Sequence, residues 1–534
     1  MRPSAVENAD QEAKPEAGQH LSAYNMMAQK QAQSKTRSDR VILLAAKGGG
    51  IAFAGNLFVY FVRFAFGVVL ARLLGAELLG LYSLSSTITD IVATLALLGL
   101  GTGLVRYLSI AISHKNEAGA WGIIQEGIAI PGLVSLVLAI GVFLFAAPLS
   151  THVFNKPNLA PVLRLASLGI PMLALIQVGS AITQGFKHME YKVYAEDVAL
   201  NLVKLVLSVV LIGAGLAVMG AMVAHLAAVT VTVVMYAYFV HRLFPLNRPL
   251  RAAKHNVGEM LRFSLPLYAS QFLSQFGGSL ETLVLGSFGL IRGVGIFTTA
   301  LRVSDVGSMF FKSLQRISIP MFSELYSHGR VDQLKRVYQV TTKWGMAFNL
   351  PIFLAIALFA GPLLSIFGAD FVTGSTGLII LAFASLFNAS TGACGSLITM
   401  TGHSRLTLAN SIINLLSTIC LDLLLIPRWG IIGAAVAATL GVVLINTLRT
   451  VQVHRLLRFW PYNLGFFKPL AAALIAFGAA HLVNQGTVFM PVLWQVIAGT
   501  IVLWGIYVLV IALLGLSEED HLILDKAWSR FTSK

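Results

Sequence analysis

Charged residues are scarce in this chain. Only 11% of its 534 residues are Asp, Glu, Lys or Arg, whereas 56% are hydrophobic, and the mean hydropathy is +0.78. Soluble domains carry about 25% charged residues. The composition therefore excludes a soluble globular protein and predicts an all-α polytopic membrane protein, because helices satisfy their own backbone hydrogen bonds in lipid.

Cysteine is almost absent, and the motifs of several enzyme classes are missing. The two cysteines, Cys394 and Cys420, lie in apolar runs, so no disulfide framework is predicted. The sequence has no Walker phosphate-binding loop and no HExxH or CxxC motif, and its 12 histidines are dispersed. We therefore expect no ATP hydrolysis by this chain, no metal site and no cofactor.

The first 40 residues contain no apolar segment, so no cleavable signal peptide is predicted. About fourteen apolar spans of roughly 18 to 27 residues follow, the length that a bilayer core requires. On this map the even-numbered loops and the two tails hold 26 Lys and Arg, against 4 in the odd-numbered loops. This bias predicts a multi-pass membrane protein with both termini in the cytoplasm. It also explains the net charge of +15 without a nucleic-acid partner.

The sequence contains an internal repeat. VHRLF at 240–244 matches VHRLL at 453–457, and Gly80-Leu81-Tyr82 matches Gly295-Ile296-Phe297, at offsets of 213 and 215. A six-span repeat keeps its orientation, so we expect two six-helix lobes related by a pseudo-two-fold axis along the membrane normal, followed by two further helices. The predicted division is a disordered cytoplasmic tail (1–40), an N-lobe (41–250, spans 1–6), a C-lobe (251–460, spans 7–12), spans 13–14 (461–516) and a cytoplasmic C-terminal tail (517–534).

The apolar stretch 294–320 carries four charges, Arg302, Asp305, Lys312 and Arg316, within roughly 80° of one another on a helix. Charges at membrane depth cost about 2.5–3.5 kcal/mol each, so this stripe is expected to face a bundle interior or a watery cavity. A purely structural alternative is that Arg302 and Asp305 neutralise each other while the outer cations reach toward water.

Three more spans present polar faces in corresponding parts of the two halves. Their candidate cavity residues are Asn56, Arg63, Asp90, Ser274 and Glu281, with Lys204 and Asp422 as further possibilities. Cations such as Arg63, Arg302 and Lys312 suit an anionic substrate group, with Asn56 and Ser274 as polar neighbours. The carboxylates Asp90, Glu281 and Asp305 suit a coupling proton or Na⁺.

Several segments resemble a known family. LGAELLGLYSLSSTITDIV (74–92), GLGTGLVRYLS (99–109), LRFSLPLYASQFLSQFGGSLETLVLGSF (261–288) and VGIFTTALRVSDV (294–306) are similar to the polysaccharide transporters of the multidrug/oligosaccharidyl-lipid/polysaccharide (MOP) exporter superfamily. The resemblance covers about residues 45–515. It implies a V-shaped central cavity that alternates between the membrane faces, and a polyprenyl-pyrophosphate-linked oligosaccharide as substrate. The arginines similar in placement to the family's cavity arginines are Arg63 and Arg302, whereas Glu281 stands where an Asp is usual.

The leading hypothesis is therefore a secondary-active flippase for surface polysaccharide biosynthesis, whose partners are the lipid-linked oligosaccharide, membrane lipids and polysaccharide assembly proteins. A multidrug (MATE)-like exporter of drugs or metabolites is the alternative, although a cationic drug would favour a more acidic cavity. A membrane-embedded glycan polymerase or ligase is a third hypothesis, but every predicted outside loop is short and none gathers an acid, a base and a nucleophile.

Overall fold

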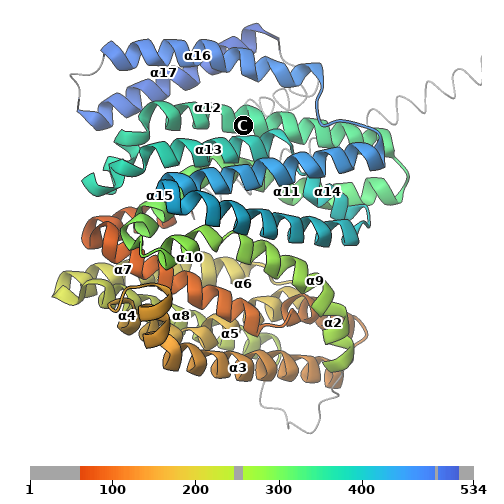
Figure 1. Cartoon of the computed structure of the whole chain (residues 1–534). Coiled ribbons are helices and arrows are strands. Elements are labelled where there is room, and N and C mark those ends of the chain that lie inside the picture. Colours follow the sequence, from red (N-terminus) through yellow and green to blue (C-terminus); the bar gives the residue numbers. More distant parts are fainter. Residues whose placement is uncertain (1–59, 246–256, 487–490, 516–534) are drawn as a thin grey trace, which may run out of the picture.

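The computed structural model describes residues 60–245, 257–486 and 491–515, and all regular structure in these ranges is helical (Figure 1). The predicted tails 1–40 and 517–534 and the candidate residue Asn56 lie outside the described residues.

The elements of the first half follow a helix at Tyr60–Ala96 and comprise α2 (Leu100–Ser113), α3 (Glu117–Pro148), the π-helical η1 (Leu149–Val153), α4 (Leu159–Ser167), α5 (Ile170–Gly185), α6 (Glu190–Lys192), the π-helical η2 (Val193–Ala199), α7 (Leu200–Leu211), η3 (Ile212–Leu216) and α8 (Ala217–Leu243). The second half comprises α9 (Val257–Gly277), α10 (Leu280–Ser287), α11 (Ile291–Ser327), α12 (Val331–Ser365), η5 (Ala369–Gly374), α13 (Ser375–Ser390), α14 (Cys394–Met400) and α15 (Ser404–Leu457). The short η6 (Leu464–Phe467) leads into α16 (Lys468–Gly486) and α17 (Val492–Leu513).

Nine helices in the described ranges are long and apolar enough to cross a membrane, and several are too long for one crossing. The 54 residues of α15 would extend about 80 Å as one straight helix, against a bilayer core of about 30 Å. The chain instead reverses at Gly430 (φ 55°, ψ −124°), and a Cβ on Gly433 would overlap the carbonyl group of Leu425. Spans 11 and 12, predicted at 406–426 and 430–451, are therefore the two arms of a hairpin, while the total of fourteen spans stays a prediction.

Two predicted spans are interrupted. Span 2 was expected at 81–103, but its helix ends at Ala96 and a turn precedes α2, since Leu98 and Gly99 both have positive φ (49° and 79°). Span 7 was expected at 261–285 and is divided into α9 and α10 by a turn at Gly278–Ser279. Hydropathy alone does not detect such breaks, because the apolar run continues across them.

The repeat is visible in the backbone. Turn residues with positive φ recur at offsets of 213 to 215, the same offsets as the sequence matches. The pairs are Gly75 and Gly289 (71° and 73°), Lys115 and Gly329 (54° and 67°), Asn155 and Gly368 (51° and 136°), Lys187 and Gly402 (66° and 88°), and Ala217 and Gly430 (44° and 55°). The two halves therefore share their turns even where the residue types differ.

The two halves cross at a pair of equivalent glycines. A Cβ on Gly80 would overlap the carbonyl oxygen of Ile291, and a Cβ on Gly295 would overlap that of Ala76. Three residues further along each helix, the Thr298 hydroxyl donates a hydrogen bond of 3.3 Å to the Ser83 hydroxyl. These two residues are 215 positions apart and are therefore equivalent in the repeat. We call these contacts the glycine crossing. Small residues allow this close approach of membrane helices.

The halves share one apolar core at one end, and at the other end α9 of the second half packs on the first half. One apolar core contains buried residues of both halves, such as Leu70 and Met222 with Phe297 and Leu364. We call the end that contains this core the closed end. At the opposite, open end the core around Leu104 belongs to the first half together with Met260 of α9, and the core around Tyr338 belongs to the second half. In Figure 1, α9 and α10 lie between the two groups of helices, and α16 and α17 pack on the far side of α12.

Candidate functional site

The charged stripe predicted at 294–320 lies on α11. Val303, Met309 and Phe311 are buried on one side of this helix, whereas Arg302 and Lys312 are exposed on the other. Thr298 on the same stripe bonds Ser83 of the first half. The stripe therefore faces the N-lobe, as an amphipathic helix lining an internal space is expected to do.

Asp305 pairs with Lys312 and not with Arg302. The Lys312 Nζ donates to Asp305 Oδ1 at 3.1 Å, and the Ser308 hydroxyl donates to the same oxygen at 3.1 Å. This corrects the structural alternative in which Arg302 and Asp305 neutralise each other. Lys312 lies seven residues, or nearly two turns, from Asp305 and so shares its face of the helix. The Arg302 side chain instead extends toward Gly67 of the first helix, where its Nη1 lies 3.7 Å from the position that a Cβ on Gly67 would take. Arg302 is thereby left available for another anion.

Three cations from three spans gather at the inner face of the N-lobe. Lys204 of α7 lies within electrostatic range of Arg63, Arg302 and Asp90, and its Nζ lies 4.6 Å from the centre of the Phe66 ring. Arg63 forms an ion pair of 3.3 Å with Asp197 of η2. Within the described residues, Arg302 forms neither a hydrogen bond nor an ion pair. We call Arg63, Lys204 and Arg302 the cation cluster, and chemically it can bind a phosphate or carboxylate.

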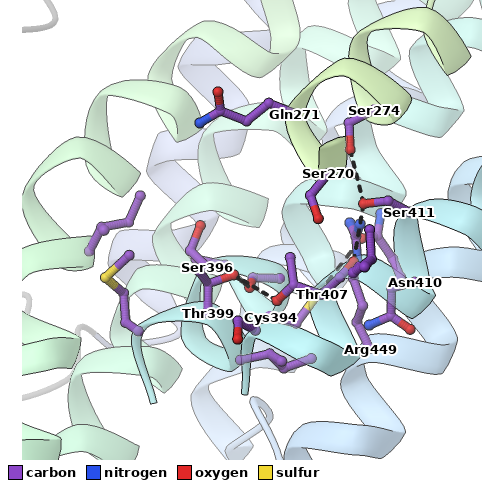
Figure 2. Close-up of a pocket in the computed structure, with 18 of the residues that line it drawn as sticks. Ser270, Gln271, Ser274, Cys394, Ser396, Thr399, Thr407, Asn410, Ser411 and Arg449 are labelled. Atoms are coloured by element: carbon purple, nitrogen blue, oxygen red, sulfur yellow. Dashed lines mark hydrogen bonds between the residues drawn. The ribbon is translucent and has the colours of Figure 1, made fainter. Parts of the chain in front are cut away.

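Two cavities lie toward the open end. The first has a volume of about 860 Å³ and lies between α9, α11, the α13–α14 region and both arms of α15 (Figure 2). The second, of about 680 Å³, lies between α2, α5, η2 and α9. Gln271 and Gln275 line both cavities, so α9 separates two chambers that meet at its polar face. Of the predicted site residues in the described ranges, Ser274 alone lines either chamber, and its hydroxyl shares a hydrogen bond of 3.2 Å with Ser411.

Two carboxylates are buried together in the C-lobe. Asp422 of α15 is fully buried, and both its oxygens lack a hydrogen-bond partner in the part of the chain that the structure describes. Glu281 of α10 is 7% exposed and lies within electrostatic range of Asp422. A buried charge without a partner is unfavourable, so this pair requires a proton or another cation.

The structure thus divides the predicted residues into separate groups. Arg63, Arg302 and Asp90 come together, Asp305 is paired with Lys312, Glu281 lies beside Asp422, and Ser274 faces a chamber. Sequence reasoning missed Asp197 and gave Arg449 no role. The acidic pair Glu196-Asp197 at the start of a largely apolar segment is the signal that would have indicated Asp197.

Comparisons with known proteins identify the family and the fold. The profile of a family described as "Polysaccharide biosynthesis protein" matches residues 45–326. The "Probable low-salt glycan biosynthesis flippase Agl15" of Haloferax volcanii is 24% identical over 395 residues, which cover 73% of this chain and 79% of that protein.

Two solved structures share the fold. A structure titled "Lipid II flippase MurJ, inward closed conformation" matches with a TM-score of 0.70 at 15% identity and covers 87% of this chain and 98% of that chain. An inward-facing multidrug resistance MATE family transporter of the MOP superfamily matches with a TM-score of 0.64 at 19% identity, over 75% of this chain and 94% of that one. At these identities the likeness establishes the fold, with two lobes of membrane helices.

Proposed function

Because the chain belongs to the polysaccharide biosynthesis protein family, we propose that it is a secondary-active flippase that moves a polyprenyl-pyrophosphate-linked oligosaccharide across the bacterial inner membrane. It is a multi-pass membrane transporter of polysaccharide biosynthesis rather than an enzyme. The inner membrane, cytoplasmic termini and contacts with polysaccharide assembly proteins are parts of this proposal.

The observation that carries the proposal is the cation cluster. A pyrophosphate is a multiply charged anion that is costly to move through lipid, and arginine binds phosphate oxygens bidentately with charge-assisted hydrogen bonds. Arg302 forms no hydrogen bond and no ion pair in the described residues, and Lys204 lies within electrostatic range of it. We assign the pyrophosphate to this cluster, with Arg302 as the principal ligand.

Alternating access follows from the two ends of the molecule. The positive-inside bias places the loops of the open end in the cytoplasm, so a lipid-linked glycan would enter there and leave after the closed end has opened. The glycine crossing lies at the closed end, where the two halves meet backbone to backbone. Helices in such close contact are a natural pivot for the rocking of one lobe against the other.

We assign the coupling ion, a proton or Na⁺, to Glu281 and Asp422. These two carboxylates are buried next to each other, so a bound cation stabilises them. Asp305 needs a coupling cation less, because it is half-exposed and already pairs with Lys312. Asp90 is the other candidate, but the nearby Lys204 competes with a coupling cation for it.

Deletion of the gene, followed by complementation, tests the function. We expect loss of surface polysaccharide, accumulation of polyprenyl-linked repeat units in the cytoplasmic leaflet, and rescue by the wild type but not by Arg302→Ala inserted at normal level. Arg292→Ala is the matched control, because Arg292 lies on the same helix but pairs with Asp370 at the closed end, at 2.8 Å. If the deletion strain instead makes normal surface polysaccharide and becomes sensitive to cationic compounds, the drug-exporter hypothesis is favoured over the flippase. Normal export by Arg302→Ala would refute its role in binding.

A further inference from the structure

The chamber of about 860 Å³ in the C-lobe contains an arginine that the cation cluster does not use. Arg449, on the second arm of α15, lines this chamber and is partly buried. Within the described residues the Arg449 guanidinium forms no hydrogen bond and no ion pair. A guanidinium held inside a membrane domain without a counter-ion is unfavourable unless a ligand supplies the anion.

The composition of the chamber indicates what kind of ligand it accepts. Most of its lining side chains carry a hydroxyl or an amide, and Figure 2 shows Ser270, Ser274, Thr399 and Thr407 around the space into which Arg449 projects. Two arginines line it, Arg449 inside and the exposed Arg405, whereas none of its described lining residues is Asp or Glu. Hydroxyl and amide groups bind polyhydroxylated ligands, and the volume lies within the usual range of about 300–1,000 Å³ for ligand pockets.

The polar lining is held in place by its own hydrogen bonds. Asn410 exchanges two amide hydrogen bonds with Gln452, at 2.7 and 2.9 Å. Asn446 donates to Asn388 at 3.0 Å, which fixes the residue one turn before Arg449. Side chains already ordered in this way lose little entropy when a ligand binds.

We propose that this chamber is the glycan subsite of the transporter and that Arg449 selects oligosaccharides bearing a carboxylate, such as a hexuronic acid. This inference rests on the proposed flippase function and extends it. The pyrophosphate occupies the cation cluster, which leaves Arg449 for an acidic sugar of the same molecule. Gln271 and Gln275 connect this chamber to the neighbouring one, so a glycan of several rings extends from one to the other.

The test compares two lipid-linked oligosaccharides that share the polyprenyl pyrophosphate and differ only in a hexuronic acid or the corresponding hexose. The full-length protein is reconstituted in liposomes and the initial rate of flipping is measured. For Arg449→Gln we expect a loss of about tenfold or more on the acidic substrate and less than about twofold on the neutral one, because a charge-assisted bond is lost in one case only. Arg449→Lys should recover much of the rate. Arg455→Gln is the matched control, an exposed cation on the same helix that lines neither chamber.

Equal losses on both substrates would assign Arg449 to the pyrophosphate and overturn the proposal, as would no loss on either. A second measurement separates binding from transport. The soluble acidic oligosaccharide, without its lipid, should raise the melting temperature of the detergent-solubilised wild type but not of Arg449→Gln. If the wild type binds this sugar and flips neither substrate, the flippase function fails and the glycan subsite stands. If Arg449→Gln flips each substrate as fast as the wild type does, the flippase function stands and the proposed role of Arg449 in a glycan subsite is refuted.

Discussion

The glycine crossing allows a prediction with a worked magnitude. A methyl group added at Gly80 overlaps the backbone oxygen of Ile291, and one added at Gly295 overlaps that of Ala76. A backbone atom cannot rotate away as a side chain does, so the two helices must move apart. Overpacking of this kind costs about 1–3 kcal/mol. We therefore expect Gly80→Ala and Gly295→Ala each to destabilise the protein by about this amount.

The two substitutions should not be additive. Both methyl groups force apart the same pair of helices, so the second one meets a gap that the first has already opened. The double variant should therefore lose less free energy than the sum of the two single losses. Unfolding by SDS in mixed micelles, followed by tryptophan fluorescence, measures these differences. Gly132→Ala in α3 is the control, because a Cβ there meets no atom within 4 Å and a helical alanine is favoured over glycine. Unchanged stability in both single variants, or strictly additive losses, would refute the reasoning.

Two further predictions concern the charges. Asp422→Asn should raise the stability of the folded protein, because it removes a fully buried carboxylate without a hydrogen bond in the described residues, and should make flipping independent of the ion gradient. Gradient-driven flux and SDS unfolding of this variant would check both effects, and a rate that still follows the gradient would exclude Asp422 from coupling. Lys312→Gln should slow flipping less than Arg302→Ala, since Asp305 already neutralises Lys312. A double-mutant cycle with Asp305→Asn should give a coupling of about 0.2–1 kcal/mol, as for other half-exposed pairs, and a larger value would contradict this assignment.

The fold was largely predictable from the sequence because the relevant information is local. Apolar runs of sufficient length predicted the helices, and the matches of VHRLF with VHRLL and of Gly80 with Gly295 predicted a repeat that the turn geometry reproduces. Breaks such as Leu98–Gly99 were not predictable, because a left-handed leucine has no characteristic pattern and the surrounding residues continue the apolar run.

The site was only partly predictable, because it depends on which helices meet. Helical periodicity placed Arg302 and Asp305 on one face, yet whether Asp305 bonds Arg302 or Lys312 depends on side-chain directions that spacing does not specify. The approach of Asp422 to Glu281 and of Asp197 to Arg63 joins residues 141 and 134 positions apart. Such contacts follow from the packing of the lobes and not from either segment alone.

The recurrence of the turns has an evolutionary consequence. In the glycine crossing, Gly80 meets Ile291 while Ala76 meets Gly295, so equivalent residues exchange partners as they do at the isologous interface of a symmetric dimer. The chain is in this sense a fused homodimer whose two subunits have diverged. The first half now supplies Arg63 and Lys204, while the second half supplies Arg302 and the buried carboxylates Glu281 and Asp422, so duplication allowed equivalent positions to take different roles. Two half-length chains expressed together would insert in the same orientation and could assemble through this same contact.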